Sequence, residues 1–315
     1  MLRLVVVRLL GIVPLVLVIG IASFIALRLI PGDAVAARLG ESYDANVAAA
    51  LRQQLGLDQP AYVQLVEWLK GLVTGDLGVS LISGQPVSSQ IAARLPVTLQ
   101  LVGFSLIVSL VLGLPLGVMA AARRNSFWDF AARVSTLTIM SIPNFFVGIL
   151  LIYLFAVFLP LLPSGGFTGF LEDPAANLVH LALPIVTLST SMAATSMRMT
   201  RTAMLDVLSQ DFIRTAKAKG ASRASVLYQH GLRNALIPIA TVVGIQASRL
   251  LAGTVIVEQV FSIPGLGSLL VDSLSRRDYT MAQGTIMTLA AMVIVVNLVI
   301  DIAYTVIDPR INHDK

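Results

Sequence analysis

Histidines, cysteines and phosphate-binding loops are the features that most directly carry chemistry in a protein sequence. The three histidines, His180, His230 and His313, lie far apart and show no HExxH or other metal-ligand spacing. The 315 residues include no cysteine, which excludes disulfides, thiolate metal sites and cysteine nucleophiles. No GxxxxGKS/T loop is present to hold ATP phosphates. We therefore expect neither an enzyme nor a metal site, and no cofactor bound by this chain.

The segment 209–234 concentrates charged residues in an otherwise apolar sequence. Ser209 or Asp211 is suited to cap a helix, and Gly220 can adopt the left-handed conformation that ends one. Ser222 can then cap a second helix. The pattern predicts a sharply bent helix pair whose small residues at the bend let a partner backbone approach.

The second helix of this pair is predicted to have two different faces. Val226, Leu227 and His230 lie within one turn of each other, while Arg223 and Tyr228 face elsewhere. A basic loop that only reflects membrane topology is the alternative interpretation. A nucleic-acid interface is poorly supported, because few aromatic residues alternate with the basic ones and no known binding module is present.

Polar side chains also occur inside long apolar stretches, where they are costly unless they pair or line a cavity. The segment Ser141–Asn144 interrupts one stretch with a proline, which suits backbone groups that line a cavity. Hydroxyl groups can instead bond to their own helix, and Arg249 can extend its guanidinium outward. The candidate residues of a translocation path are Ser141, Asn144, Thr187, Ser191, Gln246 and Arg249.

The composition points to a membrane protein. Hydrophobic residues make up 56% of the chain, charged residues 12%, and the mean hydropathy is +0.85, whereas soluble domains carry about 25% charged residues. Each stretch of about 20 apolar residues can cross a bilayer as a helix. The predicted spans are Leu9–Leu27, Val97–Ala121, Val134–Leu159, Leu181–Thr200, Ala235–Val257 and Met281–Tyr304. The first is too long for the apolar part of a signal peptide, so an uncleaved span is expected.

The charges predict an orientation with both termini in the cytoplasm. In that orientation the loops and ends carry a net charge of +8 inside and −4 outside, and Arg249 lies within a span. This distribution follows the positive-inside rule and accounts for the formal net charge of +5. The net charge therefore reflects topology and requires no acidic partner.

The long outer segment 31–96 is predicted to form a helical cap. Val47–Leu55 and Tyr62–Leu72 place apolar residues at helical spacing on either side of a turn that contains Gly56 and Pro60. The cap either packs only on its own helical bundle or docks an external partner.

The basic segment resembles the EAA loop of permease subunits of ABC importers, in the version found in the dipeptide, oligopeptide and nickel permease family. The likeness extends over nearly the whole chain, and the order and spacing of the motifs make it specific. The matching segments are Leu29–Asp33, Gly75–Gly78, Ser141–Phe145, Asp211–Gly220, Leu232–Pro238, Phe261–Gly267 and Asp308–Arg310. The long first outer loop is similar to that of the subunit that pairs with a second, different permease.

The resemblance implies an all-α membrane protein with six transmembrane helices in the type I importer arrangement. It implies a bacterial inner-membrane permease that imports peptides or similar small solutes, with dipeptides, oligopeptides, nickel chelates and glutathione-like solutes all compatible. The expected partners are a second homologous permease, an extracytoplasmic binding protein, and two ATPase subunits or a fused pair that bind ATP and Mg²⁺. The expected ATPase-coupling residues are Asp211, Arg214, Ala216, Lys217, Lys219, Gly220, Ala221, Ser222, Arg223, Val226, Leu227 and His230.

The loop departs from the general pattern of the superfamily. Arg214-Thr215-Ala216 stands where Glu-Ala-Ala is usual, and Arg233 stands where proline is usual. Contacts at Arg214 and Arg233 are therefore not carried over from sugar permeases, whereas the glycine bend is. The expected organisation is a cytoplasmic end with the first span at 1–30, the cap at 31–96, a permease core at 97–304 with the coupling loop at 201–234, and a cytoplasmic tail at 305–315.

A proton-coupled secondary transporter is the alternative function, because Asn297 and Asp301 lie in the sixth apolar stretch. Asp301 is close to the inner end of that stretch, which favours a structural role at the membrane surface. An intramembrane serine hydrolase lacks a histidine placed in a span to act as its base.

Overall fold

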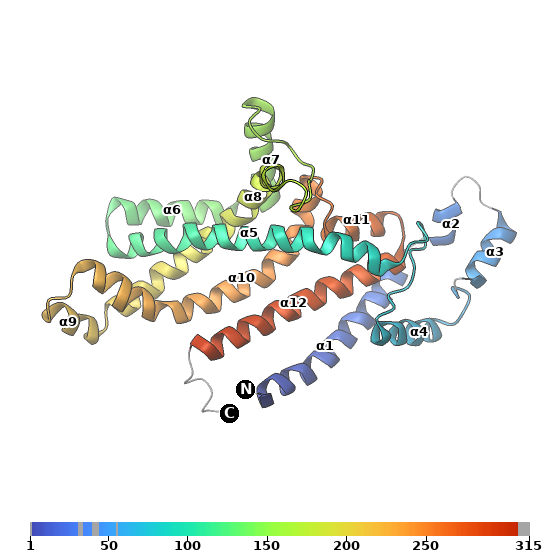
Figure 1. Ribbon diagram of the computed structural model, residues 1–315, viewed down its shortest axis with the longest axis horizontal. Coiled ribbons are helices and arrows are strands. Elements are labelled where there is room, and N and C mark those ends of the chain that lie inside the picture. Colours follow the sequence, from blue (N-terminus) through green and yellow to red (C-terminus); the bar gives the residue numbers. More distant parts are fainter. Residues whose placement is uncertain (1, 31–33, 40–43, 55, 308–315) are drawn as a thin grey trace. The chain divides into compact units, whose positions relative to one another are not determined.

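The computed structural model describes residues 2–30, 34–39, 44–54 and 56–307, and within them it forms helices and no strand (Figure 1). The side chains of 2–10, 34, 37, 54 and 301–307 are also outside the description. The helices are α1 (Leu2–Leu29), α2 (Ala34–Leu39), α3 (Ala45–Gln54), α4 (Ala61–Thr74), α5 (Val87–Ala122), α6 (Phe127–Ser141), α7 (Asn144–Ile152), η2 (Tyr153–Phe158), α8 (Pro174–Leu208), α9 (Asp211–Ala218), η3 (Ser225–Leu232), α10 (Arg233–Val260), α11 (Leu266–Ser275) and α12 (Tyr279–Ile307).

In the part of the chain that the structure describes, long apolar helices occur at five of the six predicted spans. Five are long and apolar enough to cross a membrane: Gly11–Leu29, Val87–Ala122, Pro174–Leu208, Ser225–Val260 and Tyr279–Ile300. The fourth predicted span, rich in Ser and Thr, lies inside the longer helix α8, which Asp173 caps by accepting from the N–H groups of Ala175 and Ala176. The all-α membrane class is confirmed.

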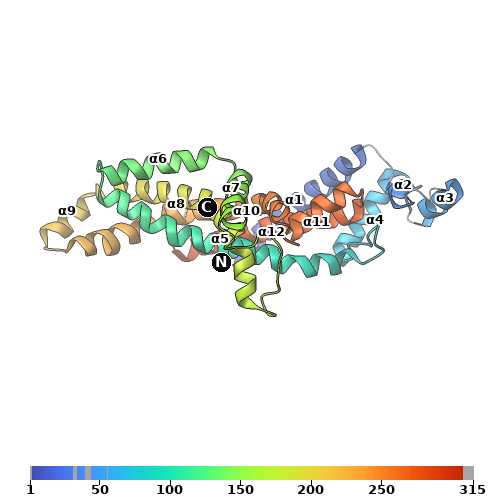
Figure 2. The same cartoon turned by 90° about the horizontal axis from the view of Figure 1, so that it is seen from above.

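The third predicted span is not one straight helix, which corrects the expectation for Val134–Leu159. The helix pair Phe127–Ser141 and Asn144–Phe158 is bent by 96° (Figure 2). Ile142 adopts an extended conformation (φ −94°, ψ 127°) because the ring of Pro143 disfavours a helical residue before it. The segment is a broken span or a re-entrant loop, as the proline in Ser141–Asn144 indicated.

The described chain divides into two compact units. The first comprises the described parts of Met1–Thr98 and Pro264–Ile294, and the second those of Leu99–Ile263 and Val295–Lys315. The predicted division at residues 30, 96 and 304 separates segments by their location relative to the membrane. Units defined by internal contacts do not test that division. Residues 308–315 of the predicted tail lie outside the described residues.

In the first unit, a buried aspartate fastens the return loop of the cap to the start of α12. The carboxylate of Asp278 accepts from the hydroxyl of Ser80 and from the N–H groups of Leu81 and Met281, the last two at 3.1 and 3.2 Å. The cap contains the predicted helix, turn and helix, as α3 and α4. Asp278 thus holds the second end of the cap in place.

In the second unit, α8 is the central helix and packs against α6, α7 and α10. It also meets α5 at two glycines one turn apart, Gly113 and Gly117. A Cβ at Gly117 would lie 2.6 Å from Cβ of Thr200 and 2.7 Å from the carbonyl oxygen of Met197. Such small-residue contacts allow the close backbone approach that replaces hydrophobic packing inside membranes.

Candidate functional site

The predicted coupling loop begins where α8 ends, but not with the predicted cap. Ser209 is the C-cap residue that follows the last residue of α8, Leu208, and its hydroxyl donates to the carbonyl of Asp206. Gln210 precedes α9 without a side-chain cap, and Asp211 is already helical. The cap prediction for Ser209 and Asp211 is therefore wrong, because α8 continues farther than expected and uses Ser209 at its own end.

The bend at Gly220 is present. Gly220 has φ +80°, its N–H donates to the carbonyl of Lys217 at 3.0 Å, and the N–H of Ala221 donates to Ala216 at 3.1 Å. These two bonds form a Schellman motif, in which a left-handed glycine ends the helix. A Cβ at Gly220 would meet no atom within 4 Å. The positive φ, and not crowding, is what requires glycine here.

The second half of the bend starts at Ser222, whose hydroxyl accepts from the N–H of Ser225 at 3.2 Å, as predicted. It continues as η3, a π-helix, a wider form that was not expected. Val226 is buried, Leu227 and His230 are half-buried, and Arg223 and Tyr228 are exposed.

The bent pair rests on an apolar cluster at the ends of α5, α8 and α10. Ile213 of α9 is fully buried, and α9 packs on η3. A Cβ at Gly231 would lie 2.9 Å from Cε of Met204, so η3 approaches α8 closely. The buried members of the cluster are Val118, Ala121, Ala203, Met204, Ala235 and Ile239, and Leu227 and Leu232 pack against it.

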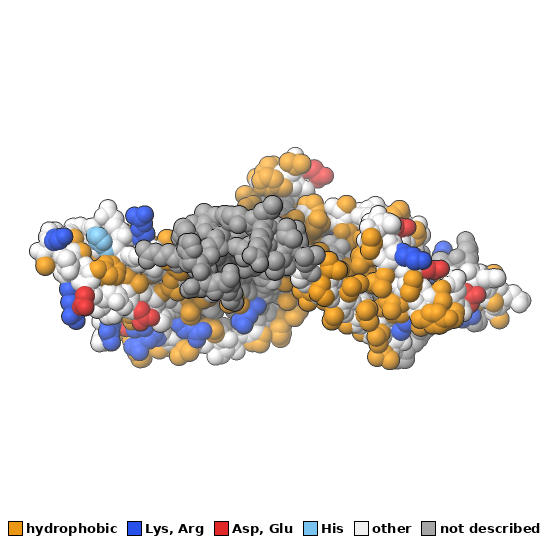
Figure 3. Space-filling model, turned by 90° about the horizontal axis from the view of Figure 1, so that it is seen from below, with side chains coloured by type: hydrophobic (Ala, Val, Ile, Leu, Met, Phe, Trp, Pro, Cys, Tyr) orange, Lys and Arg blue, Asp and Glu red, His pale blue; other side chains and the backbone are white. Residues whose placement is uncertain are grey.

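The face of the bent pair that points away from the apolar cluster is exposed and basic. Lysine and arginine side chains gather at the end of the second unit that contains α9 (Figure 3). The Asp211–Arg214 ion pair at 3.3 Å is almost fully exposed and contributes little to stability. The exposed predicted coupling residues are Asp211, Arg214, Lys217, Lys219, Gly220, Ser222 and Arg223, and the half-buried ones are Ala216, Ala221, Leu227 and His230.

Arg223 connects this surface to the end of α5. Its Nη2 donates to the carbonyl oxygen of Ala122 at 3.2 Å. That carbonyl belongs to the last turn of α5, where carbonyl groups lack partners inside the helix. The bond joins the bent pair to the corner between α5 and α6.

An ion pair that sequence analysis missed lies at the same corner. Asp129 of α6 is fully buried, and both its carboxylate oxygens accept from Arg201 of α8, at 2.5 and 2.9 Å. Its second oxygen also accepts from the N–H of Asn125 at 3.0 Å. The hydroxyl of Ser126 caps α6 by accepting from the N–H of Asp129 at 3.4 Å. The capping-box spacing Ser126-x-x-Asp129 was the available signal, although it does not identify Arg201.

The candidate path residues lie in different environments. Thr187 is buried and donates to the carbonyl of Leu183, and Gln246 is 7% exposed and donates to the hydroxyl of Ser196 at 3.4 Å. Ser141 is exposed and donates to the carbonyl of Leu137. Asn144, Ser191 and Arg249 complete the set, the first two half-buried and the last exposed.

Comparison with known proteins decides the family. Residues 113–313 match the family described as binding-protein-dependent transport system inner membrane component, and residues 1–102 match its N-terminal domain. The chain belongs to this family. It is 41% identical over 302 residues to a protein of Brucella suis named as a peptide transport system permease, covering 96% of each chain. It is also 41% identical over 313 residues to a glutathione transport system permease protein of Salmonella typhimurium, covering 99% of this chain and 100% of the relative.

The resemblance to ABC importer permeases is therefore confirmed. The chain is a multi-pass inner-membrane permease subunit of an ABC importer. Family membership also answers the alternative of a proton-coupled secondary transporter. In this permease Asn297 accepts a hydrogen bond from the hydroxyl of Ser248 at 2.7 Å, and the side chain of Asp301 lies outside the described residues.

Proposed function

We propose that this permease forms, with a second homologous permease subunit, the path by which peptides or similar small solutes cross the membrane. An extracytoplasmic binding protein delivers the solute, and two ATPase subunits, or a fused pair, bind ATP and Mg²⁺ and hydrolyse the ATP. The names of the relatives, peptide and glutathione transport permeases, support this class of solute. We propose that both termini lie in the cytoplasm, and the positive-inside distribution of charge supports this orientation.

The observation that carries the proposal is the exposed bent pair of α9 and η3 around Gly220. It is basic, free of side-chain bulk at the bend, and seated on the cluster that joins α5, α8 and α10. An ATPase subunit that binds the bent pair moves α5, α8 and α10 together as a rigid body. The Arg223 contact with Ala122 extends the movement to the α5–α6 corner.

The path itself is proposed to follow the broken third span and helices α8 and α10. These three segments carry polar side chains and, at Pro143, an interrupted backbone. Inside a membrane such groups are stable only where they are hydrogen-bonded or line a cavity. Arg249, exposed on α10, is the group suited to meet the carboxylate of a peptide. Ser141, Asn144, Thr187, Ser191 and Gln246 are proposed to shape the remainder of the path.

Reconstitution tests this function. The permease is placed in proteoliposomes with its second permease, ATPase subunits and binding protein, and uptake of labelled di- and tripeptides is followed with ATP on the ATPase side. Uptake should require ATP and the binding protein, and persist when a protonophore removes the proton gradient. Uptake that collapses with the gradient while ATP persists would contradict the ABC assignment, and copurification with mass spectrometry of bound solute would identify the substrate.

A further inference from the structure

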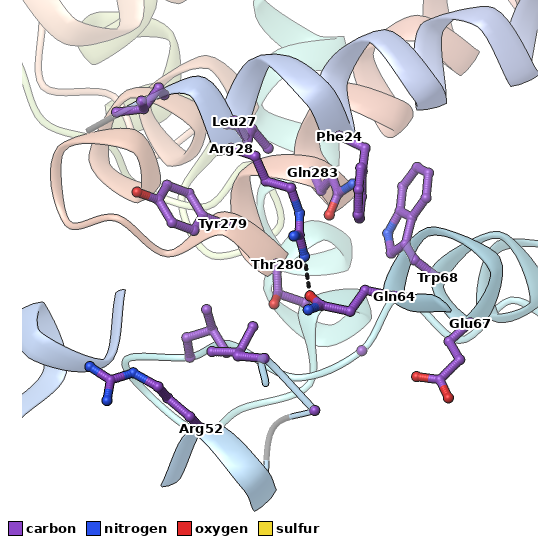
Figure 4. Close-up of a pocket in the computed structure, with 15 residues that line it drawn as sticks. Phe24, Leu27, Arg28, Arg52, Gln64, Glu67, Trp68, Tyr279, Thr280 and Gln283 are labelled. Atoms are coloured by element: carbon purple, nitrogen blue, oxygen red, sulfur yellow. Dashed lines mark hydrogen bonds between the residues drawn. The ribbon is translucent and has the colours of Figure 1, made fainter. Parts of the chain in front are cut away.

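A cavity of about 510 Å³ in the first unit lies where the end of α1, the helix α4 and the start of α12 meet (Figure 4). Its volume is that of a site for a small molecule or a headgroup. Its wall combines the aromatic rings of Phe24, Trp68 and Tyr279 with the polar groups of Arg28 and Gln283. None of these residues is among the predicted coupling or path residues.

The guanidinium of Arg28 is held in place by neutral groups. One of its Nη atoms donates to Oε1 of Gln64, and its central carbon lies 4.4 Å from the centre of the Phe24 ring. Phe24 in turn lies 6.5 Å from Trp68, between ring centres. A guanidinium has five N–H donors, so this arrangement fixes its position and leaves donors for an additional acceptor.

The positive charge of Arg28 is not neutralised by the acid in the cavity wall. Glu67 is the acidic residue that lines the described cavity. Glu67 is exposed, and Figure 4 shows its carboxylate directed away from the guanidinium of Arg28. The cavity therefore favours an anion.

Gln283 supplies a second, independent donor. Its side chain lines the cavity and is 7% exposed, and its Nε2 has no hydrogen-bond partner among the described residues. A buried donor without a partner costs about 1–3 kcal/mol, which an acceptor in the cavity would recover. A ligand with several oxygen atoms satisfies both Gln283 and Arg28.

The surroundings of the cavity are those of a membrane surface. Arg28 lies at the end of the apolar span Gly11–Leu29, and Ile25 and Leu29 on either side of it are 52% and 76% exposed. Trp68 and Tyr279 are the residue types that concentrate at the level of lipid headgroups. Tyr62, Val66 and Val73 form an exposed apolar stripe along α4, as in a helix that lies on a bilayer surface.

We propose that this cavity binds the phosphate of an anionic phospholipid. Arg28 and Gln283 donate to the phosphate oxygens, and the acyl chains lie along the exposed apolar side chains of α1. The predicted orientation places this site in the outer leaflet. The lipid fills the space between α1, α4 and α12 and so fastens the cap to the membrane surface.

The test uses the full-length permease in detergent, depleted of lipid, with thermal unfolding measured against added lipid. Phosphatidylglycerol should stabilise it more than phosphatidylcholine, because the cavity is positive. Arg28→Gln and Gln283→Leu should each weaken the apparent affinity for phosphatidylglycerol about tenfold, the scale of one charge-assisted hydrogen bond. Lys70→Gln, at an exposed residue of α4 that does not line the cavity, should leave the affinity unchanged.

Other ligands give different results in the same assay. Equal stabilisation by both lipids, or an unchanged affinity in Arg28→Gln and Gln283→Leu, would overturn the proposal. Full protection by inorganic phosphate would identify a free-anion site, and competition by a dipeptide or by the purified binding protein would identify a solute or protein site. Native mass spectrometry of lipid retained by Gln283→Leu keeps the test decisive if Arg28→Gln does not fold.

Discussion

Arg201 donates from Nε and Nη2 to the two carboxylate oxygens of Asp129, at 2.5 and 2.9 Å, and thereby joins α8 to α6. The carboxylate is fully buried, and the side chain of Arg201 is 19% exposed. Such two-point pairs fix geometry as well as charge. Asp129 also accepts from the N–H of Asn125, in the same α5–α6 corner whose Ala122 carbonyl accepts from Arg223.

Removal of one partner of this pair should destabilise the permease strongly. Asp129→Ala leaves the Arg201 charge largely buried without a counter-ion, and such losses cost about 3–5 kcal/mol. Thermal unfolding in detergent measures the effect. Arg133→Met is the control, because Arg133 is 52% exposed and 3.9 Å from the same carboxylate. The double variant Asp129→Leu with Arg201→Met should recover much of the loss, and equal instability of the single and double variants would refute the pairing energy.

Gly220→Val should uncouple transport from ATP hydrolysis. A β-branched residue at φ +80° costs about 1–2 kcal/mol in backbone strain, which straightens or loosens the bend. Gly220→Asn tolerates this φ and should keep most of the activity, since added atoms meet open space. Solute-stimulated ATPase activity of the reconstituted complex is measured at equal amounts of inserted permease. Normal stimulation in Gly220→Val would show that the bend is not a coupling element.

Two alanine substitutions on α5 should have very different effects on the stability of the permease. A Cβ at Gly117 would press on the backbone and side chain of α8, which costs about 1–3 kcal/mol, whereas Gly103 has no neighbour within 4 Å. Gly117→Ala should therefore lower the unfolding temperature and Gly103→Ala should not. Equal effects would mean that α5 does not approach α8 at Gly117.

Removal of the α2–α3 segment should weaken delivery by the binding protein. Replacement of residues 34–54 by a short Gly/Ser linker spares α4 and the Ser80–Asp278 contact, so the permease should still fold. The expected result is a lower affinity of the binding protein for the complex with unchanged basal ATPase activity. An unchanged affinity would show that this part of the cap packs only on its own bundle.

Arg249→Gln should affect the transport of peptides with a charged C-terminus more than that of peptides without one. If Arg249 meets the peptide carboxylate, the KM for a dipeptide should rise about tenfold, while that of the dipeptide amide changes little. Transport assays with both peptides in reconstituted complex measure this difference. Arg198→Gln, an exposed arginine on α8, is the matched control. An equal change for both peptides would place Arg249 outside the path.

The sequence alone determined the features that depend on nearby residues. Apolar length predicted where spans occur, since the membrane requires about 20 apolar residues for each helix. Gly220 and Ser222 predicted the bend, because helix ends are set by the conformations and hydrogen bonds of a few neighbouring residues. The ordered motifs also identified the family, and with it the function.

Only the tertiary structure decided which distant groups meet. Asp129 and Arg201 are separated by 72 positions, and the sequence around either residue does not predict its partner. The placement of Gly117 against Thr200 likewise depends on how two separate helices pack, and the proline that breaks the third span did not give the 96° angle between its halves. The cap prediction at Ser209 failed because the same side chain can serve either of two adjoining helices, and here its hydroxyl bonds to Asp206 at the end of α8.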